Sequence, residues 1–208
     1  MRARFITLDG IDGAGKSTHI AYMQQWFASQ DIPVLFTREP GGTPVGEALR
    51  SLLLDPQTQA SLNTETLMMF AARMQHLEQV IYPSLKQGVW VVSDRFTDAT
   101  FAYQGGGRGV PMERITQLAN WVQQGFEPDL TFIFDVPLSV AQQRIEKTRD
   151  KDRFEQEESA FFERVRDVYL ERANLSPNRY RVLDSAAEIE SIQRIIGVNL
   201  QILLEQSR

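Results

Sequence analysis

The stretch of this 208-residue chain that most restricts its fold is Gly10-Ile11-Asp12-Gly13-Ala14-Gly15-Lys16-Ser17-Thr18. It fits G-x-x-x-x-G-K-[ST], the pattern of a loop whose backbone N–H groups surround a bound polyphosphate. The pattern needs a strand before the loop and a helix after it. Residues 4–8 are predicted to form that strand, and residues 18–29, with apolar side chains at helical spacing, that helix. The sequence therefore predicts a nucleoside triphosphate site near the N-terminus.

The residue types in this loop indicate how it would bind the triphosphate. The helix is expected to begin near Lys16, so that its unpaired N–H groups and its positive dipole end face the phosphates. Lys16 is expected to reach the β- and γ-phosphate oxygens, and the Ser17 hydroxyl is expected to bind Mg²⁺. The loop residues predicted to bind ATP are Gly10, Gly13, Ala14, Gly15, Lys16, Ser17 and Thr18.

The overall charge and composition argue against several classes of partner. A formal net charge of −5 at pH 7 does not suit a general binder of nucleic acid or of membrane surfaces. No apolar run approaches the ~20 residues of a membrane span. The absence of cysteine excludes disulfides and fits a cytoplasmic protein. The length suits one domain, which is expected to span residues 1–208.

Apolar segments that suit strands alternate along the chain with amphipathic segments that suit helices. This alternation predicts an α/β fold of the P-loop NTPase type, a five-stranded parallel sheet flanked by helices. Thr43 is expected to cap the second helix and Asn63 or Thr64 the third, in which Pro83 allows a break. Three successive glycines at 105–107 leave two alternatives, a mobile segment or a simple loop. The predicted strands are 4–8, 34–37, 89–92, 130–135 and 180–184, and the predicted helices are 18–29, 45–54, 63 or 64 to 86, 97–104, one from 111, 139–147, 157–173 and 189–204.

Charged residues follow two of the predicted strands, at the sheet edge where α/β proteins bind ligands. The planar guanidinium of Arg38 suits a phosphate, although a solvated charge in a glycine-rich turn is the alternative. Asp94 would hold Mg²⁺ or its water shell, and Arg95 would clamp an anion. The alternative for these two is that they pair only with each other.

Phe70 and Arg73 are three residues apart and share a helical face. They could sandwich and hydrogen-bond a nucleobase. On local grounds alone, a core phenylalanine beside a surface arginine is the better interpretation.

The segment 147–155 carries seven charged side chains. A solvated loop is the plain interpretation of such a run. Arg144, Arg149 and Arg153 nevertheless recur every four to five residues, and a transferred phosphoryl group needs cations that close over it. We therefore expect a mobile lid at about residues 144–157.

The remaining patterns narrow the kind of nucleotide protein. The base-reading pattern N-K-x-D of GTPases is absent, and so is a strand ending in Asp-Glu, as most motor ATPases carry. The arginines at 38, 95 and in the expected lid exceed what one triphosphate needs. They imply a second anionic substrate, and therefore transfer between two phosphates rather than hydrolysis.

Taken together, these stretches resemble the bacterial thymidylate kinase (dTMP kinase) family over essentially the whole chain. The Arg-Glu-Pro-Gly-Gly-Thr run at 38–43 is nearly diagnostic of that family. The other stretches that carry the resemblance are 8–18, 70–73 (Phe-Ala-Ala-Arg), 93–96 (Ser-Asp-Arg-Phe), 102–109 (Ala-Tyr-Gln-Gly-Gly-Gly-Arg-Gly) and 152–155 (Asp-Arg-Phe-Glu).

The resemblance implies the reaction ATP + dTMP → ADP + dTDP, with Mg²⁺, in a homodimer of nucleoside monophosphate kinase architecture. It implies that Arg38 and Arg95 grip the dTMP phosphate. Asp12 would orient the arginine that grips the phosphate, and also the sugar 3′-hydroxyl. Arg73 would reach the carbonyl edge of thymine.

The same resemblance implies contacts to the sugar and the base. Tyr103 would pack on the deoxyribose, and Thr100 and Gln104 would touch the base. The family usually has a phenylalanine four residues before the base-reading arginine, where this chain has Met69. Either Met69 packs against thymine or the helix presents Phe70, and the sequence favours Phe70.

On the donor side, the resemblance places Arg144 over adenine, with Ser185 and Ala186 on the other side of the ring, and Asp94 near the metal. Gly13 stands where eukaryotic-type enzymes carry an arginine, so the cation for the transferring group would come from the lid. The residues expected to act in catalysis are Asp12, Lys16, Arg38, Arg95, Arg149 and Arg153.

Two rival functions remain at this stage. One is another nucleoside monophosphate kinase, or a deoxynucleoside kinase whose acceptor is a hydroxyl. The other is a P-loop module that binds nucleotide as a switch or in a scaffold.

Overall fold

The computed structural model describes residues 2–145, 153–154 and 157–207. Five parallel strands form its sheet, in the order β2-β3-β1-β4-β5. This confirms the predicted α/β fold and all five predicted strands, to within one or two residues at their ends. The strands are β1 (Phe5–Asp9), β2 (Val34–Arg38), β3 (Trp90–Asp94), β4 (Leu130–Asp135) and β5 (Tyr180–Asp184).

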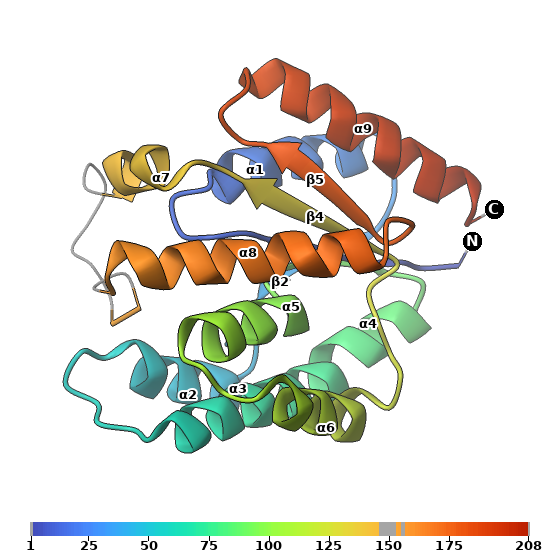
Figure 1. The fold of residues 1–208 in the computed structure, drawn as a ribbon. Coiled ribbons are helices and arrows are strands. Elements are labelled where there is room, and N and C mark those ends of the chain that lie inside the picture. Colours follow the sequence, from blue (N-terminus) through green and yellow to red (C-terminus); the bar gives the residue numbers. More distant parts are fainter. Residues whose placement is uncertain (1, 146–152, 155–156, 208) are drawn as a thin grey trace.

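Helices cover both faces of the sheet. Figure 1 shows α1 and α9 on one face, and α8 and α5 on the other. The central strand β1 is buried along its whole length, between β3 and β4. The loop that follows β1 therefore leaves the middle of the sheet at its carboxyl edge. The helices are α1 (Lys16–Ser29), α2 (Pro44–Leu54), α3 (Leu62–His76), η1 (Leu77–Ile81), α4 (Tyr82–Lys86), α5 (Thr97–Thr100), η2 (Phe101–Gly107), α6 (Met112–Gln123), α7 (Leu138–Ile145), α8 (Ser159–Leu175) and α9 (Ile189–Glu205), where η1 and η2 are π-helical.

The long third helix differs from its prediction at its N-terminal end, whereas its end at Lys86 and the break that Pro83 allows are confirmed. The predicted cap, Asn63 or Thr64, is wrong: the Ser61 hydroxyl accepts the bond from the Thr64 N–H at 3.2 Å. Further along, the helix widens into η1 just before Pro83, which stands in the first turn of α4. Proline has no N–H to donate four residues back, and a π-turn accommodates such a gap in the bonding ladder.

The three glycines at 105–107 belong to the end of the π-helix η2, so a simple loop is wrong for this stretch. A Cβ on Gly106 would lie 2.6 Å from Val168 Cγ2, and one on Gly107 would lie 2.6 Å from Phe161 Cζ. Their lack of a side chain lets η2 approach α8 closely, and that contact fixes the helix carrying Tyr103 and Gln104.

The core is continuous from the sheet into the helices on both faces. Phe70, Leu77 and Ile81 are buried in it, whereas Leu67 of the same helical segment is 53% exposed. Within the described ranges, no helix is both long and apolar enough to cross a bilayer.

Candidate active site

The phosphate-loop pattern forms the predicted strand–loop–helix unit. Gly10, Gly13 and Gly15 have φ angles of 138°, 77° and 86°, which side chains disfavour. A Cβ on Gly10 would lie 2.5 Å from the carbonyl oxygen of Phe134. The side chain of Lys16 folds back over the loop, with Nζ 3.4 Å from the Ile11 carbonyl oxygen. Its pKa is lowered by burial and by the nearby charge of Arg95.

A cavity opens beside this loop, at the carboxyl edge of β1 and β3. Charged side chains line the end near the loop, and the far end is mixed apolar and polar. The lining residues are Asp12, Glu39, Pro40, Arg50, Leu54, Met69, Arg73, Arg95, Phe96, Ala99, Thr100, Tyr103, Gln104 and Phe154.

The loop end of the cavity is organised around Arg95. Its Nη2 donates to Asp12 Oδ1 at 2.8 Å and to the Tyr103 hydroxyl at 3.1 Å. Its Nη1 donates to the Gly10 carbonyl at 2.9 Å and to the Tyr169 hydroxyl at 3.1 Å. The alternative in which Arg95 pairs only with Asp94 is therefore wrong, because its ion pair is with Asp12.

The Asp12 carboxylate is held ionised by its surroundings. Burial by itself raises its pKa, but the charges of Arg95 and Lys16, with a hydrogen bond of 2.8 Å from the Tyr103 hydroxyl, bring the pKa down to about 2. The same ion pair outweighs burial for Arg95 and raises its pKa well above its usual value. Asp12 is thus built to orient Arg95, not to accept a proton.

Asp94 ends β3, opposite Leu8 of the central strand. Its Oδ1 is buried and has no hydrogen-bond partner among the described residues. An unpaired carboxylate oxygen beside a phosphate loop suits Mg²⁺ or a water bound to it. The exposed Ser17 hydroxyl at the start of α1 would be the second protein oxygen. Mg²⁺ keeps several waters and phosphate oxygens as ligands, so two protein oxygens fit it.

Arg73 and its neighbours form the far end of the cavity. Arg73 is only 2% exposed, so the interpretation of this residue as a surface arginine is wrong. Its guanidinium lies 4.9 Å from the ring centre of Phe70 and 5.1 Å from that of Phe96. Met69 lines the cavity, whereas Phe70 is buried in the core and does not. The side chain that faces the cavity is therefore that of Met69, not that of Phe70.

Thr100 and Gln104 both line the cavity. Thr100 Oγ1 accepts from Arg73 Nη2 at 3.0 Å. Gln104 Nε2 donates to the buried carboxylate of Glu65 at 3.0 Å. Their side chains are therefore oriented by α3 before any ligand enters.

Arg38 does not join this cavity. Its side chain is 55% exposed and its Nη2 donates to Glu47 Oε2 at 3.0 Å. The sequence reasoning missed Arg50, which lines the cavity and donates from Nη1 to the Pro40 carbonyl at 2.9 Å. Arg50 and Leu54 are four residues apart on α2, so they share one face of the helix, and both line the cavity. This helical spacing is the sequence signal that could have identified Arg50.

The predicted donor-side residues also meet. Arg144 donates from Nη2 to the Ser185 carbonyl at 3.0 Å and from Nη1 to the Gly13 carbonyl at 3.4 Å. Ser185 and Ala186 follow β5 at the same edge of the sheet, and the Ala186 N–H donates to Asp184 Oδ1 at 2.9 Å. Arg144 thus spans from the phosphate loop to the loop after β5.

The expected lid, 144–157, falls largely outside the described residues, and so does Arg149. Arg153 is described, but its contacts are with the acceptor side: an ion pair with Glu65 and a 2.9 Å hydrogen bond from Nε to the Leu53 carbonyl. Phe154 beside it lines the cavity. The structure therefore places the Arg153 guanidinium against α2 and α3.

A phosphate loop and a separate, arginine-lined cavity share the carboxyl edge of one five-stranded parallel sheet, an arrangement that defines a P-loop nucleoside monophosphate kinase. The family model for thymidylate kinase matches residues 8–196. The chain is 63% identical over 196 residues to a thymidylate kinase of Neisseria meningitidis serogroup B, covering 94% of this chain and 95% of that protein. It is 57% identical over 205 residues to the thymidylate kinase of Chromobacterium violaceum, covering 99% and 97%.

A crystal structure of thymidylate kinase from Ehrlichia chaffeensis superposes with a TM-score of 0.78 at 33% identity, covering 97% of this chain and 99% of that one. The chain belongs to the thymidylate kinase family.

Proposed function

We propose that this protein transfers the γ-phosphoryl group of ATP to the phosphate of dTMP, giving ADP and dTDP for dTTP synthesis. The observation that carries the proposal is the cavity beside the phosphate loop, with Arg95 at one end and Arg73 at the other. A nucleoside monophosphate needs a cation for its phosphate and a donor for its base. A deoxynucleoside acceptor would leave the arginines at the loop end without a phosphate.

In this proposal Arg95, held by Asp12, binds the dTMP phosphate. Arg50 points to the same cavity from α2 and is a further candidate for that phosphate. Arg38 Nη2 forms an ion pair with Glu47 Oε2 at 3.0 Å in this structure. Arg38 takes part in binding the phosphate only if this ion pair breaks. Bidentate guanidinium contacts suit a phosphate that must be held in line with its attacker.

The sugar and base follow from the same cavity. Tyr103, whose hydroxyl is bonded to Asp12 and Arg95, lies where the deoxyribose would pack. Met69, Arg73, Thr100 and Gln104 surround the place of the thymine ring. Arg73 would donate to a thymine carbonyl.

For the donor, the loop residues Gly10, Gly13, Ala14, Gly15, Lys16, Ser17 and Thr18 would bind the ATP phosphates. Arg144 would lie against adenine, with Ser185 and Ala186 on its other side. Mg²⁺, held by Ser17 and Asp94, would neutralise charge that develops on the phosphates. The residues near 144–157, with Arg149 and Arg153, are proposed as the lid that supplies the remaining cations.

The chemistry needs no general base. An anionic oxygen of the dTMP phosphate attacks the γ-phosphorus, and the bond from that phosphorus to the β–γ bridging oxygen breaks, leaving ADP. Positioning and charge neutralisation are then the work of the protein, as in other phosphoryl transfers. The low pKa of Asp12, about 2, suits a group that orients Arg95 while remaining ionised.

The proposal extends to the form of the protein: one domain over residues 1–208, a homodimer, and a place in the cytoplasm. Support for the dimer comes from the family together with large apolar side chains left exposed, among them Leu67 at 53% and Trp121 at 68%. Sedimentation velocity across a concentration series measures the dimer directly.

An ADP-release assay tests the activity with dTMP, dUMP, dCMP, dGMP and thymidine as acceptors. We expect dTMP to be used with the highest kcat/KM, and thymidine not to be used. ATP turnover that no monophosphate changes would rule out the kinase. Preference for thymidine would favour a deoxynucleoside kinase.

A further inference from the structure

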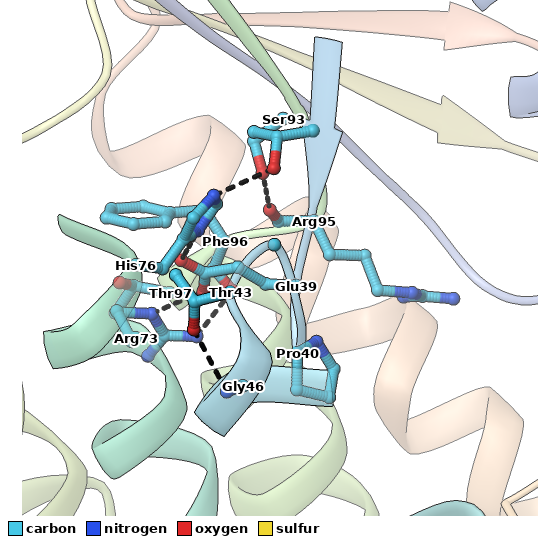
Figure 2. Close-up of polar contacts among 12 residues, drawn as sticks. Glu39, Pro40, Thr43, Gly46, Arg73, His76, Ser93, Arg95, Phe96 and Thr97 are labelled. Atoms are coloured by element: carbon cyan, nitrogen blue, oxygen red, sulfur yellow. Dashed lines mark hydrogen bonds and ion pairs between the residues drawn. The ribbon is translucent and has the colours of Figure 1, made fainter. Parts of the chain in front are cut away.

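Behind the base end of the cavity, α3 and the segment after β2 share a buried chain of polar contacts. Arg73 Nε donates to Glu39 Oε2 at 2.7 Å. The other oxygen of that carboxylate, Oε1, lies 3.0 Å from His76 Nδ1, and His76 Nε2 lies 2.8 Å from Thr37 Oγ1. Figure 2 shows Glu39, Arg73 and His76 side by side, with Arg95 extending away from them.

Arg73 uses only part of its donor capacity within the protein. Nε binds Glu39, and Nη2 donates to the Phe96 carbonyl at 3.1 Å and to Thr100 Oγ1 at 3.0 Å. Nη1 is buried and has no partner among the described residues. A buried donor without a partner costs free energy, so a ligand that accepted from Nη1 would be favoured. The Arg73 side chain lines the cavity, and Nη1 is therefore its group available to a ligand.

His76 cannot touch that ligand. It is 0% exposed, does not line the cavity, and stands between Thr37 and Glu39. A carboxylate accepts hydrogen bonds, so Nδ1 carries the proton toward Glu39, and Nε2 can accept from the Thr37 hydroxyl. The ring is also confined by the loop after β2, because a Cβ on Gly42 would lie 2.6 Å from His76 Nε2.

We propose that His76 is a positioning residue for recognition of the acceptor base: it fixes the Glu39 carboxylate, which in turn fixes the plane of the Arg73 guanidinium and the direction of Nη1. This inference rests on the proposed role of Arg73 in binding the base. An N–H aimed at a fixed point favours a base with a carbonyl oxygen there, as in thymine and uracil, over cytosine, which carries an amino group at that place. His76 thereby sharpens discrimination between dTMP and dCMP.

The test compares His76→Leu and His76→Asn with the wild-type full chain in steady-state assays with dTMP and dCMP. His76→Leu removes both links, and we expect the KM for dTMP to rise about tenfold, with the KM for ATP and kcat nearly unchanged. His76→Asn keeps an N–H near the place of Nδ1, and should restore the KM for dTMP to within about threefold of wild type. The ratio of kcat/KM for dTMP over dCMP should fall in His76→Leu and recover in His76→Asn.

Leu77→Ala is the matched control for loss of stability. Leu77 is the next residue, is also 0% exposed, and has no polar link to Glu39. We expect this variant to lose thermal stability while keeping the KM for dTMP and the dTMP to dCMP ratio. If it raised the KM for dTMP as much as His76→Leu does, a general effect of destabilisation would replace the proposed positioning role.

A double-mutant cycle separates this inference from the function on which it rests. In an Arg73→Ala background, adding His76→Leu should not change the KM for dTMP further, because His76 acts through Arg73. An additive effect would contradict the inference, as would an unchanged KM in His76→Leu alone when Arg73→Ala raises it. If Arg73→Ala itself left the KM for dTMP unchanged, the base-binding role of Arg73 would fail, and the inference with it. If the wild type did not phosphorylate dTMP at all, the proposed function itself would be wrong.

Discussion

Two arginines at the wall of the acceptor cavity are each held by a carboxylate, and so is Arg38 outside it. Asp12 holds Arg95 and Glu39 holds Arg73, both at the cavity wall. Glu47 holds Arg38 outside it, and also accepts from the Gly42 N–H at 2.9 Å. The positions of these three arginines therefore depend on their carboxylate partners.

Replacement of Asp12 tests whether its ionised carboxylate, paired with Arg95, stabilises the fold. The measurement is the pH dependence of the free energy of unfolding. The pKa of Asp12 falls from 3.8 to about 2 in the fold, so its contribution is present above about pH 4 and is lost as the pH falls toward 2. Asp12→Asn should lower the free energy of unfolding at pH 7 by roughly 2 kcal/mol. Urea unfolding at several pH values measures the difference, which should shrink between pH 4 and pH 2.

Asp167→Asn, at an exposed position of α8, serves as the control for the loss of one carboxylate. A difference between wild type and Asp12→Asn that stayed constant down to pH 2 would show that the ionisation of Asp12 does not stabilise the fold.

The sequence identified those site residues that directly follow strands or that belong to a recognisable run. Asp12, Asp94 and Arg95 are of this kind, and the structure brings all three to one sheet edge. Arg50 was missed because it lies in the middle of a helix, where an arginine is ordinarily a solvated charge. Glu39 belongs to the Arg-Glu-Pro-Gly-Gly-Thr run, but its partners come from α3, more than 30 residues away, and only the fold reveals them.

At the scale of secondary structure, the strands were predictable and the π-helices were not. The inner strands β1, β3 and β4 are mostly buried and rich in apolar residues, and the partly buried edge strands β2 and β5 were predicted as well. A π-turn differs from an α-turn by one residue and leaves no comparable pattern. Around η2 the decisive factor is tertiary packing, since the glycines at 105–107 meet α8 rather than solvent.

Gly107→Ala tests this packing. The added methyl group would meet the Phe161 ring, with Cζ 2.6 Å from the ideal Cβ position, and we expect a loss of about 1–3 kcal/mol in the free energy of unfolding. Gly197→Ala in α9 is the matched control. Its methyl group makes one close approach, to the Tyr22 hydroxyl, which is the end of a side chain that can move, and alanine favours a helix interior. Chemical denaturation should show Gly197→Ala to be neutral or stabilising; equal losses in both variants would argue against the close contact of η2 with α8.

At the scale of the whole molecule, donor and acceptor sites lie side by side because both follow from the carboxyl edge of the sheet. The phosphate loop follows β1, Asp94 and Arg95 end or follow β3, and the Ser185 loop follows β5. Arg153 joins the two sites in another way. It comes from the segment proposed as the lid, yet its guanidinium pairs with Glu65, whose carboxylate also orients Gln104 in the acceptor cavity.

From this position we propose two separable roles for Arg153, one toward the transferring phosphoryl group and one in the acceptor site. If it leaves Glu65 to meet the transferring phosphoryl group during turnover, Arg153→Ala should lower kcat by about 10²-fold, the scale of a lost transition-state charge contact, with a smaller change in the KM for dTMP. Arg108→Ala is the control, because Arg108 Nε also lies near Glu65, at 3.6 Å from Oε1, and it too belongs to the surroundings of the base cavity. We expect Arg108→Ala to raise the KM for dTMP while leaving kcat within about threefold of wild type.

Pre-steady-state measurement of the chemical step in both variants distinguishes the two roles of Arg153. An Arg153→Ala enzyme with a raised KM for dTMP and an unchanged rate of the chemical step would confine Arg153 to the acceptor site. The catalytic cation would then have to come from elsewhere in the chain.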